Sequence, residues 1–260
     1  MTVRRGIILA AGLGSRLADG SGVPKPLVKV GGRSLIEHVL AAFEGAGLTE
    51  AVVVVGFQGD RIREAVSGER GIRVEVVENA EWKKSNGVSV LAAAGKLDQP
   101  CVLSMSDHLY GAGLVRALSG VSDDDESCQL LVDGDVAGVF DIDDATKVRR
   151  EGDRIVAIGK DLTEYDGIDC GVFRVTPALV EAVGEAYGER GDCSLSDGVR
   201  RLCERDRMRA VAVSGEAWLD VDTPEALRQA RVLLQAGAFG RGRAVPARVR
   251  ARAGVVLPSA

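Results

Sequence analysis

Short apolar runs alternate with amphipathic segments through the first 110 residues, and this alternation limits the fold more than any other feature of the chain. The runs are rich in Val, Ile, Leu and Ala, which is typical of strands buried on both faces of a sheet. Helices between successive strands indicate β-α-β units and a mostly parallel sheet. The expected strands are 6–12, 50–57, 72–79 and 100–110, and the expected helices are 34–47, 60–67 and 85–97.

The second half of the chain changes rhythm. Apolar and polar residues alternate over 146–162 around a polar turn at 150–154, which predicts a hairpin. The residues 122–127 are acidic and predict a solvated surface loop. Further strands are expected at 167–176, 208–215 and 217–222, and further helices at 176–188, 195–206 and 223–237. The predicted fold is therefore α/β and Rossmann-like, with a mostly parallel mixed central sheet flanked by helices.

Two boundaries carry local signals. Ser34 is a favourable N-cap for the first helix, Glu37 three residues later completes a capping box, and Gly47 ends the helix. The stretch 236–260 is rich in Arg, Ala and Gly and has no helical periodicity, so we expect a tail or linker after a single domain over 1–235.

Composition excludes several classes of protein. A formal net charge of -5 argues against DNA or RNA as the main partner, because such proteins usually carry a basic patch. The five cysteines form no C-x-x-C pair and are odd in number, which indicates free thiols in a reducing compartment. The apolar run near the N-terminus stops at Gly12, too early for a signal peptide, and no apolar stretch reaches 18 residues. We therefore expect a cytoplasmic protein that does not span a membrane.

A glycine-rich segment follows the first expected strand. It reads A-A-G-x-G-x-R-L over 10–17, and P-K-P-L follows at 24–27. Backbone N–H groups in such a turn, with a helix N-terminus, can bind an anion. Arg16 adds a fork for phosphate oxygens, and Lys25 adds a cation between two prolines. The segment matches neither G-x-G-x-x-G nor the Walker A loop. The alternative is a surface loop with solvated basic residues.

Three aspartates stand near the ends of expected strands. Asp107 lies in the polar end of the fourth strand, and Asp220 and Asp222 lie two residues apart, so their side chains point to one face of a late strand. Ligands of open α/β sheets bind at the carboxyl ends of strands. Carboxylates facing a triphosphate there are a plausible Mg²⁺ site. The alternatives are a turn or cap role for Asp107, and capping of the last helix by Asp222 or Thr223.

From about Ile7 to Leu233 the chain resembles the nucleotidyltransferases that join a nucleoside triphosphate to a phosphorylated sugar or alcohol, which have a GT-A-like fold. More narrowly, "SDHLY" at 106–110, the run 144–173 and "WLDVDTPE" at 218–225 resemble the inositol-1-phosphate cytidylyltransferase domain. The resemblance implies that CTP, with Mg²⁺, is attacked at its α-phosphorus by the phosphate of a small alcohol. Pyrophosphate then leaves.

The resemblance also implies roles for individual residues. Arg16, Lys25 and Lys160 are implied as catalytic, and Asp107, Asp220 and, less firmly, Asp222 as metal ligands. The implied nucleotide-binding residues are Leu9, Ala10, Ala11, Gly12, Gly14, Ser15, Arg16, Asn86, Gly87, Ser89, Ser106 and Asp107. The implied substrate-binding residues are Lys25, His108, Lys160, Asp169 and Gly171, with Glu164 and Asp166 as weaker candidates. Three alternatives stay open: Asn86 as a helix cap, His108 as a packed turn residue and Lys160 as solvated surface.

The acceptor and the assembly are less constrained. L-myo-inositol 1-phosphate is the first candidate acceptor, and phosphonates such as 2-hydroxyethylphosphonate or phosphocholine are alternatives. Aromatic residues make up 4% of the chain, which weakens the case for a choline pocket. The inositol domain is commonly fused to a membrane-embedded transferase, so a homodimer and a part of a larger fused protein are both open. A non-catalytic nucleotide-binding module is the alternative of another class, and a dinucleotide-dependent oxidoreductase is disfavoured by the missing third glycine.

Overall fold

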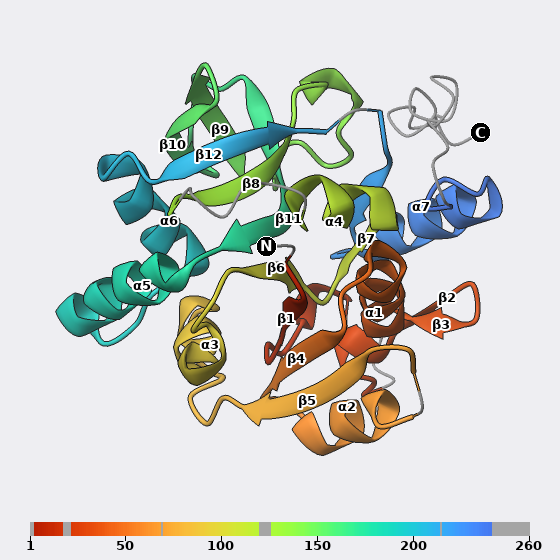
Figure 1. Cartoon of the computed structure of the whole chain (residues 1–260). Helices are drawn as coiled ribbons and strands as arrows, with labels where there is room; N and C mark the ends of the chain where they lie inside the picture. The colour runs from red at the N-terminus through yellow and green to blue at the C-terminus, as the bar shows by residue number, and fades with distance from the viewer. Residues whose placement is uncertain (1–2, 18–21, 69, 120–125, 214, 241–260) are drawn as a thin grey trace.

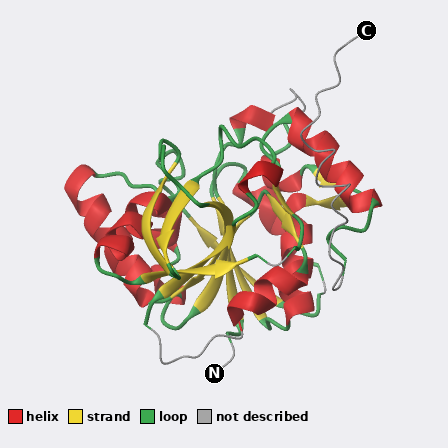
Figure 2. Ribbon diagram, turned by 90° about the horizontal axis from the view of Figure 1, so that it is seen from above, coloured by secondary structure: helices red, strands yellow, loops and turns green. Residues whose placement is uncertain are grey.

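A nine-stranded mixed sheet runs through the centre of the computed structural model, with helices on both of its faces (Figures 1 and 2). The structure describes residues 3–17, 22–68, 70–119, 126–213 and 215–240. The strand order is β5-β4-β1-β6-β11-β8-β12-β10-β9. Strands β5, β4, β1 and β6 run parallel to one another, and β11 then pairs antiparallel with both β6 and β8. The prediction of an α/β mixed sheet is confirmed, and its β-α-β part is the N-terminal half.

The strands of this sheet are β1 (Arg5–Ala10), β4 (Glu50–Val55), β5 (Arg73–Glu78), β6 (Cys101–Met105), β8 (Cys128–Asp133), β9 (Lys147–Glu151), β10 (Arg154–Gly159), β11 (Gly167–Val175) and β12 (Met208–Ala212). The helices are α1 (Leu35–Ala46), α2 (Gly59–Val66), α3 (Gly87–Ala92), α4 (Ala112–Ser119), α5 (Pro177–Arg190), α6 (Leu195–Glu204) and α7 (Pro224–Gln235). Two small sheets pair β2 (Lys29–Val30) with β3 (Arg33–Ser34) and β7 (His108–Tyr110) with β13 (Trp218–Asp220).

Alternation along β1 divides the core into two layers. Ile7 and Leu9 pack with α3, α5 and α6 on one face of the sheet, whereas Ile8 and Ala10 pack with α1, α2 and α4 on the other. All four side chains are buried, as expected for a strand covered on both faces. A third, smaller core lies under α7 and the small sheets.

The expected helix signals are present. The Ser34 hydroxyl and backbone N–H both approach the Glu37 carboxylate, at 2.7 and 2.8 Å, and Gly47 ends α1 in the left-handed conformation with φ 93°. At α7 it is Thr223, not Asp222, that caps: its Oγ1 accepts from the Ala226 N–H at 3.1 Å. The Asp222 side chain is therefore left for another role.

Several elements differ from the prediction. The strand expected over 100–110 is two strands, because the chain turns at Ser106 and Asp107 and β7 leaves the main sheet to pair with β13. The helix expected over 85–97 is α3 followed by a 3-10 turn at Ala94–Lys96. The helix α4, the buried strand β8 and the β2–β3 hairpin were not predicted. Most of the acidic loop and residues 241–260 of the expected tail lie outside the described residues.

All five cysteines are free thiols, and four of them are buried. Burial raises the pKa of Cys101 and of Cys203 to about 12. Of the helices in the described part of the chain, none combines the length and the apolar character needed to cross a bilayer.

Candidate active site

A cavity of about 510 Å³ opens at the carboxyl ends of β1 and β6, where the α/β rule places ligands. Its wall contains most of the residues that the sequence singled out, from both halves of the chain. These are Leu9, Ala10, Ala11, Gly12, Gly14, Arg16, Lys25, Asn86, Ser89, Ser106, Asp107, His108, Lys160, Asp169, Gly171, Asp220 and Asp222. Of the predicted site residues, Gly87 does not line the cavity, and Ser15 has a side chain that lies outside the described part.

The glycine-rich loop forms one wall. A Cβ at Gly12 would meet nothing within 4 Å, so this stretch of backbone faces open space. Gly14 has φ +63°, and a Cβ there would lie 2.4 Å from the Lys25 Cβ, so glycine is needed for the backbone conformation and for the Lys25 stem. The loop leads into a 3-10 turn at Ser15–Leu17 rather than a regular helix. Its backbone and Arg16 are thus what the loop offers to an anion.

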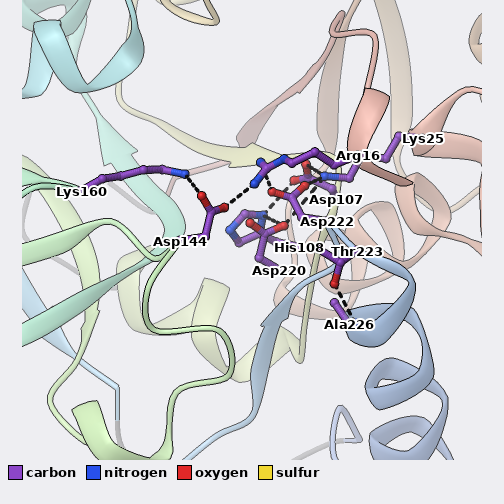
Figure 3. Close-up of polar contacts among 10 residues, drawn as sticks. All are labelled: Arg16, Lys25, Asp107, His108, Asp144, Lys160, Asp220, Asp222, Thr223 and Ala226. Carbon is purple, nitrogen blue, oxygen red and sulfur yellow. Dashed lines mark hydrogen bonds and ion pairs between the residues drawn. The ribbon is translucent and has the colours of Figure 1, made fainter. Parts of the chain in front are cut away.

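Lys25 lies at the centre of the site (Figure 3). Its side chain is 8% exposed, and its Nζ is 2.5 Å from Asp107 Oδ2, in contact with Asp222 and 4.0 Å from Asp220 Oδ1. A single ammonium group thereby offsets part of the negative charge of three aspartates.

The β7–β13 pair brings the carboxylates together. His108 is opposite Asp220 in this antiparallel register, and the Val221 N–H donates to the Asp107 carbonyl at 3.0 Å. His108 Nδ1 is 2.9 Å from Asp107 Oδ1 and 3.9 Å from Asp220 Oδ1. The ring of Trp218 stacks on the other side of His108, with centroids 6.4 Å apart. Two strands that are distant in sequence thus fix this cluster.

Charge and burial compete in this cluster. Burial opposes ionisation of Asp107, but Lys25 and His108 outweigh it and hold the pKa of Asp107 well below its usual range. Burial also opposes a charged His108, but Asp220, Asp107 and Asp169 raise the pKa of this imidazole to about 9. Burial raises the pKa of Asp220, with His108 acting in the opposite direction. The cluster therefore holds carboxylate charges that Lys25 and His108 offset only in part.

Asp107 and Asp220 suit a divalent cation. Ligand atoms of Asp107, His108 and Asp220 lie within 4.8 Å of one another, and Asp220 Oδ1 is buried without a hydrogen-bond partner in the described part of the chain. Oxygen ligands suit Mg²⁺ better than imidazole does, so the two carboxylates fit this ion and His108 lies beside them. Within the described residues, Asp222 is not part of this group. It contacts Arg16 and Lys25 instead.

A chain of ion pairs connects cavity-lining residues from the two halves of the protein (Figure 3). Arg16 contacts both Asp222 and Asp144, and Asp144 Oδ1 accepts from Lys160 Nζ at 2.7 Å. Burial opposes ionisation of Asp144, but Lys160 and Arg16 lower the pKa of this carboxyl. Lys160 is thus held on the cavity wall rather than solvated in isolation. Asp144 was not singled out as a site residue, because it is one of three aspartates within 141–144 and nothing local distinguishes it from a solvated turn residue.

The predicted substrate residues Asp169 and Gly171 lie at a bulge in β11. Asp169 Oδ1 accepts from the Gly171 N–H at 2.7 Å, and burial raises the pKa of Asp169 to about 6. Gly171 has φ +70°, and a Cβ there would lie 2.3 Å from His108 Nε2. Glycine at this position therefore makes room for the His108 ring.

The segment around α3 forms another wall. Asn86 does not cap α3 with its side chain; its Oδ1 accepts from the Leu195 N–H at the start of α6, at 2.8 Å. Gly87 is required by packing, because a Cβ there would lie 2.6 Å from the Cys193 carbonyl oxygen. The weaker candidates point elsewhere: Glu164 pairs with Arg149 and Asp166 with Arg150.

The sequence also missed Trp82, Asp133 and Trp218, which line the same cavity. The Trp218 Nε1 donates to Asp133 Oδ2 at 2.8 Å. Each residue lies in an apolar or turn segment where nothing local distinguishes it from core, so only the tertiary structure reveals it.

The first half of the chain thus contributes the glycine-rich loop, Arg16 and Lys25 to the cavity. The second half contributes aspartates, among them Asp220 and Asp222. Anion-binding backbone, cations and carboxylates in one cavity suit a phosphorylated ligand together with a divalent cation. Residues 6–139 match the family model of the MobA-like NTP transferase domain, and the chain belongs to this family.

Known proteins agree with this class. The chain is 38% identical over 234 residues to the "Bifunctional IPC transferase and DIPP synthase" of Rubrobacter xylanophilus, covering 87% of this chain but 52% of that protein. It is 33% identical over 203 residues to the "2-aminoethylphosphonate cytidylyltransferase" of Lancefieldella rimae, covering 71% of this chain and 74% of that protein. The inositol-1-phosphate CTP transferase structure from T. maritima superposes with a TM-score of 0.82 at 24% identity, covering 94% of this chain and 99% of that one, which confirms the fold.

Proposed function

We propose that the protein is a Mg²⁺-dependent cytidylyltransferase that joins CTP and L-myo-inositol 1-phosphate to give a CDP-alcohol and pyrophosphate. The observation that carries the proposal is the extent of the similarity to the Rubrobacter relative, because 87% of this chain is matched and the match therefore extends over both halves of the chain. The chain spans about half the length of that relative, so the proposal concerns the transferase activity alone.

In the proposed reaction a phosphate oxygen of the acceptor attacks the α-phosphorus of CTP. A new P–O bond forms, the bond between the α-phosphorus and the bridging oxygen breaks, and pyrophosphate leaves with the electron pair. The acceptor phosphate is already an anion, so no nucleophilic side chain is needed. Catalysis then depends on alignment and on neutralisation of charge, as in phosphoryl transfer generally.

The residues of the cavity divide this work. The backbone of Gly12 and Gly14 with Arg16 binds the triphosphate, and Lys25 approaches the reacting phosphates from the same wall. Lys160 faces Arg16 across Asp144, so one carboxylate positions a cation on each side of the reacting groups. Asp107 and Asp220 would hold Mg²⁺, which when bound supplies further neutralisation of the triphosphate. His108 orients Asp107 through its 2.9 Å hydrogen bond.

A phosphonate acceptor is the second candidate. The Lancefieldella relative is named for 2-aminoethylphosphonate and is covered over 74% of its length, which supports this alternative. Asp133 and Asp169 in the cavity wall suit the hydroxyls of a polyol and also an amine, so they do not decide between the two acceptors. A non-catalytic module is disfavoured because Arg16, Lys25, Asp107 and Asp220 are all retained. The free thiols support a reducing compartment such as the cytoplasm.

The test is a screen of pyrophosphate release. CTP, UTP, ATP and GTP are each combined with inositol 1-phosphate, 2-hydroxyethylphosphonate, 2-aminoethylphosphonate and phosphocholine, with Asp107→Asn as the background control. The highest kcat/KM is expected for CTP with inositol 1-phosphate. Release with a phosphonate but not with inositol 1-phosphate would move the protein to the second candidate. Release with UTP or GTP above CTP would contradict the choice of nucleotide.

A further inference from the structure

The Asp133 carboxylate lies in the cavity wall, and no step of the proposed phosphate chemistry uses it. Asp133 is the last residue of β8 and is 8% exposed. Its Oδ1 accepts from the Asp135 N–H at 2.9 Å, and its Oδ2 accepts from Trp218 Nε1 at 2.8 Å. Both of these donors are neutral, and among the residues that the structure describes no basic side chain forms an ion pair with Asp133. The charge of this carboxylate is therefore left to solvent or to a ligand in the cavity.

The two contacts orient Asp133 without using all of its acceptor sites. Each oxygen of a carboxylate has about two acceptor sites, and here each oxygen receives one N–H group. A carboxylate has no proton to donate, so a ligand can pair with it only through O–H or N–H groups. A phosphate oxygen at this place would meet a charge of its own sign. Asp133 thus suits a part of a substrate that carries hydrogen-bond donors and no phosphate.

Trp218 connects Asp133 to the candidate metal site. It begins β13, which pairs with β7, and Asp220 lies two residues further along the same strand. The Trp218 ring is nearly parallel to the His108 ring, at 9° with centroids 6.4 Å apart, while its Nε1 donates to Asp133. The indole therefore fixes the Asp133 carboxylate relative to the strand that carries Asp220.

The two halves of the chain offer different walls to the two substrates of the proposed reaction. Gly12, Gly14 and Arg16 come from the first half and suit the triphosphate of the nucleotide. Asp133 and Asp169 come from the neighbouring strands β8 and β11 of the second half. With the nucleotide along the first wall, the acceptor occupies the second. Its phosphate faces the cations, so the rest of the acceptor faces the carboxylates.

We propose that Asp133 is a specificity-determining residue that accepts hydrogen bonds from the ring hydroxyls of a polyol phosphate acceptor, and that Trp218 is its positioning residue. A buried group that pairs with a substrate hydroxyl discriminates against an analogue without that hydroxyl, because the group then stays unpaired. An amine on the acceptor and the ribose hydroxyls of the nucleotide have the same donor chemistry, so the test includes both. The inference rests on the proposed transferase activity and adds the group that recognises the acceptor beyond its phosphate.

The test compares ligands with and without hydroxyls. Asp133→Asn is nearly isosteric, but one end of the amide is a donor, so the side chain accepts from fewer groups. The KM for inositol 1-phosphate, measured by pyrophosphate release at saturating CTP and Mg²⁺, should rise by about tenfold or more. Ethyl phosphate carries the phosphate without ring hydroxyls and is measured as a competitor of inositol 1-phosphate. Its inhibition constant should stay unchanged, because the contacts to phosphate are retained.

Two further variants separate positioning from a structural role. Trp218→Phe keeps a ring beside His108 but removes the Nε1 donor, so the KM for inositol 1-phosphate should rise by a smaller factor. In the Asp133→Asn background it should add little, because Trp218 acts through Asp133. Asp153→Asn makes the same change of charge at an exposed position outside the cavity wall and should leave both constants unchanged. If Asp133→Asn does not fold, Trp218→Phe carries the test with the same two ligands.

The other donor-bearing groups give different results. If Asp133 binds the ribose, Asp133→Asn should raise the KM for CTP but not that for 2′-deoxy-CTP or 3′-deoxy-CTP, and this result would overturn the inference. A loss seen with 2-aminoethylphosphonate but not with inositol 1-phosphate would assign Asp133 to an amine and overturn the choice of hydroxyls. An equal loss for inositol 1-phosphate and ethyl phosphate would show that the variant disturbs phosphate binding instead.

The proposed function and this inference fail in distinguishable ways. A wild-type enzyme that releases no pyrophosphate with inositol 1-phosphate and any nucleotide would overturn the proposed function itself. An active wild type whose KM for inositol 1-phosphate is unchanged in folded Asp133→Asn would overturn this inference alone. Additive effects of Trp218→Phe and Asp133→Asn on that KM would overturn the positioning role of Trp218.

Discussion

Lys25 and its three aspartates show how single residues are assigned in this site. Asp107 contacts both Lys25 and His108, whereas Asp222 contacts Lys25 and Arg16 and lies outside the group that fits a cation. Asp220 Oδ1 is buried and, within the described residues, accepts no hydrogen bond. These contacts support Asp107 and Asp220 as the metal ligands and give Asp222 the task of holding the two cations. The ligand roles stay predictions.

Asp107→Asn should keep the fold and lose activity. The substitution is nearly isosteric but removes a negative ligand from an ion that neutralises phosphate oxygens, so turnover should fall by about a hundredfold or more. Asp220→Asn should lose turnover to a similar extent. The double variant should lose much less activation free energy than the two single variants added together, because both carboxylates would bind the same ion. Pyrophosphate release is measured across a Mg²⁺ titration of EDTA-stripped enzyme. Full turnover without divalent metal, or Asp107→Asn as fast as wild type, would contradict the assignment.

Lys25→Ala and Arg16→Ala provide the contrast in the same titration. They should also slow turnover, but through lost contacts to phosphate, so excess Mg²⁺ should not restore it. Recovery of turnover at high Mg²⁺ in either variant would contradict this expectation. It would mean that the Lys25 or Arg16 side chain supports metal binding and does not contact the substrate phosphates.

Residues of the site differed in how well the sequence predicted them. Gly14, Arg16 and Lys25 belong to one glycine-rich segment of the sequence. The residue types in this segment were enough to predict an anion-binding loop, and all three residues line the cavity. Asp144 was missed because it contacts a partner distant in sequence, Arg16. Gly87 stays a predicted nucleotide contact on the resemblance alone. The structure shows a packing requirement at this position, because a Cβ on Gly87 would lie 2.6 Å from the Cys193 carbonyl oxygen, and the sequence did not indicate that contact.

At the scale of elements, the start of α6 gives a measurable link between capping and pH. The Asp197 carboxylate accepts from the Ser194 N–H at 2.7 Å and contacts Arg200. Burial opposes ionisation, but the contacts with Ser194 and Arg200 lower the pKa of Asp197 to about 2. Asp197→Asn should therefore reduce the free energy of unfolding by about 1 kcal/mol at pH 7.

The pH dependence of that loss has a defined sign. The folded pKa lies below the unfolded value of about 3.9, so the stabilisation is fully present above that value and disappears as the pH falls toward about 2. Urea unfolding of both proteins between pH 7 and pH 3 measures the difference. Arg63→Gln on the exposed side of α2 is a surface control. A difference that stays constant down to pH 3 would show that the carboxylate charge does not contribute.

Elements with a strong local pattern were predicted, and those that depend on tertiary contacts were not. The strands β1 and β4 and the helix α1 carry continuous apolar runs or explicit caps. The strand β8 is as fully buried and has six residues like β1 and β4, but polar Gln129 and Asp133 leave an apolar run of only three residues between them, and an acidic stretch precedes it. The break between β6 and β7 falls at Ser106 and Asp107, which favour turns, but no Gly or Pro marks it, and β7 leaves the main sheet to pair with β13. The turn at this break positions Asp107 beside Asp220. A feature that the sequence did not predict therefore determines the arrangement of the candidate metal ligands.

The whole molecule joins two halves around one cavity. Arg16 comes from the loop after β1, whereas Asp144 and Lys160 flank the β9–β10 hairpin of the second half. The β-α-β alternation of the sequence predicted the fold of the N-terminal half. The packing of the second half against it could not be predicted in this way, because it depends on antiparallel pairing of β11 with β6 and β8. The ion pair between Arg16 and Asp144 joins the two halves and depends on this pairing of β11.

The end of the domain is the last feature that can be tested on the whole chain. The sequence predicts a boundary after residue 235, but Ala238 is 7% exposed in the core under α7, and its N–H donates to the Leu233 carbonyl at 3.0 Å. The Phe239 carbonyl oxygen would lie 3.2 Å from a Cβ at Gly111, so this backbone is closely packed too.

Two truncations locate the boundary. The chain cut after Gly240 should keep the stability and kcat/KM of the full chain, because the cavity-lining residues in the described part of the chain all precede position 234. The chain cut after Gln235 loses the Ala238 and Phe239 contacts and should unfold with about 1–3 kcal/mol less free energy, since it exposes the core under α7. Thermal and urea unfolding of the three proteins, with pyrophosphate release beside them, measure both effects. Equal stability of the two truncated chains would place the boundary at 235, and a loss on cutting after Gly240 would mean that the later residues belong to the domain.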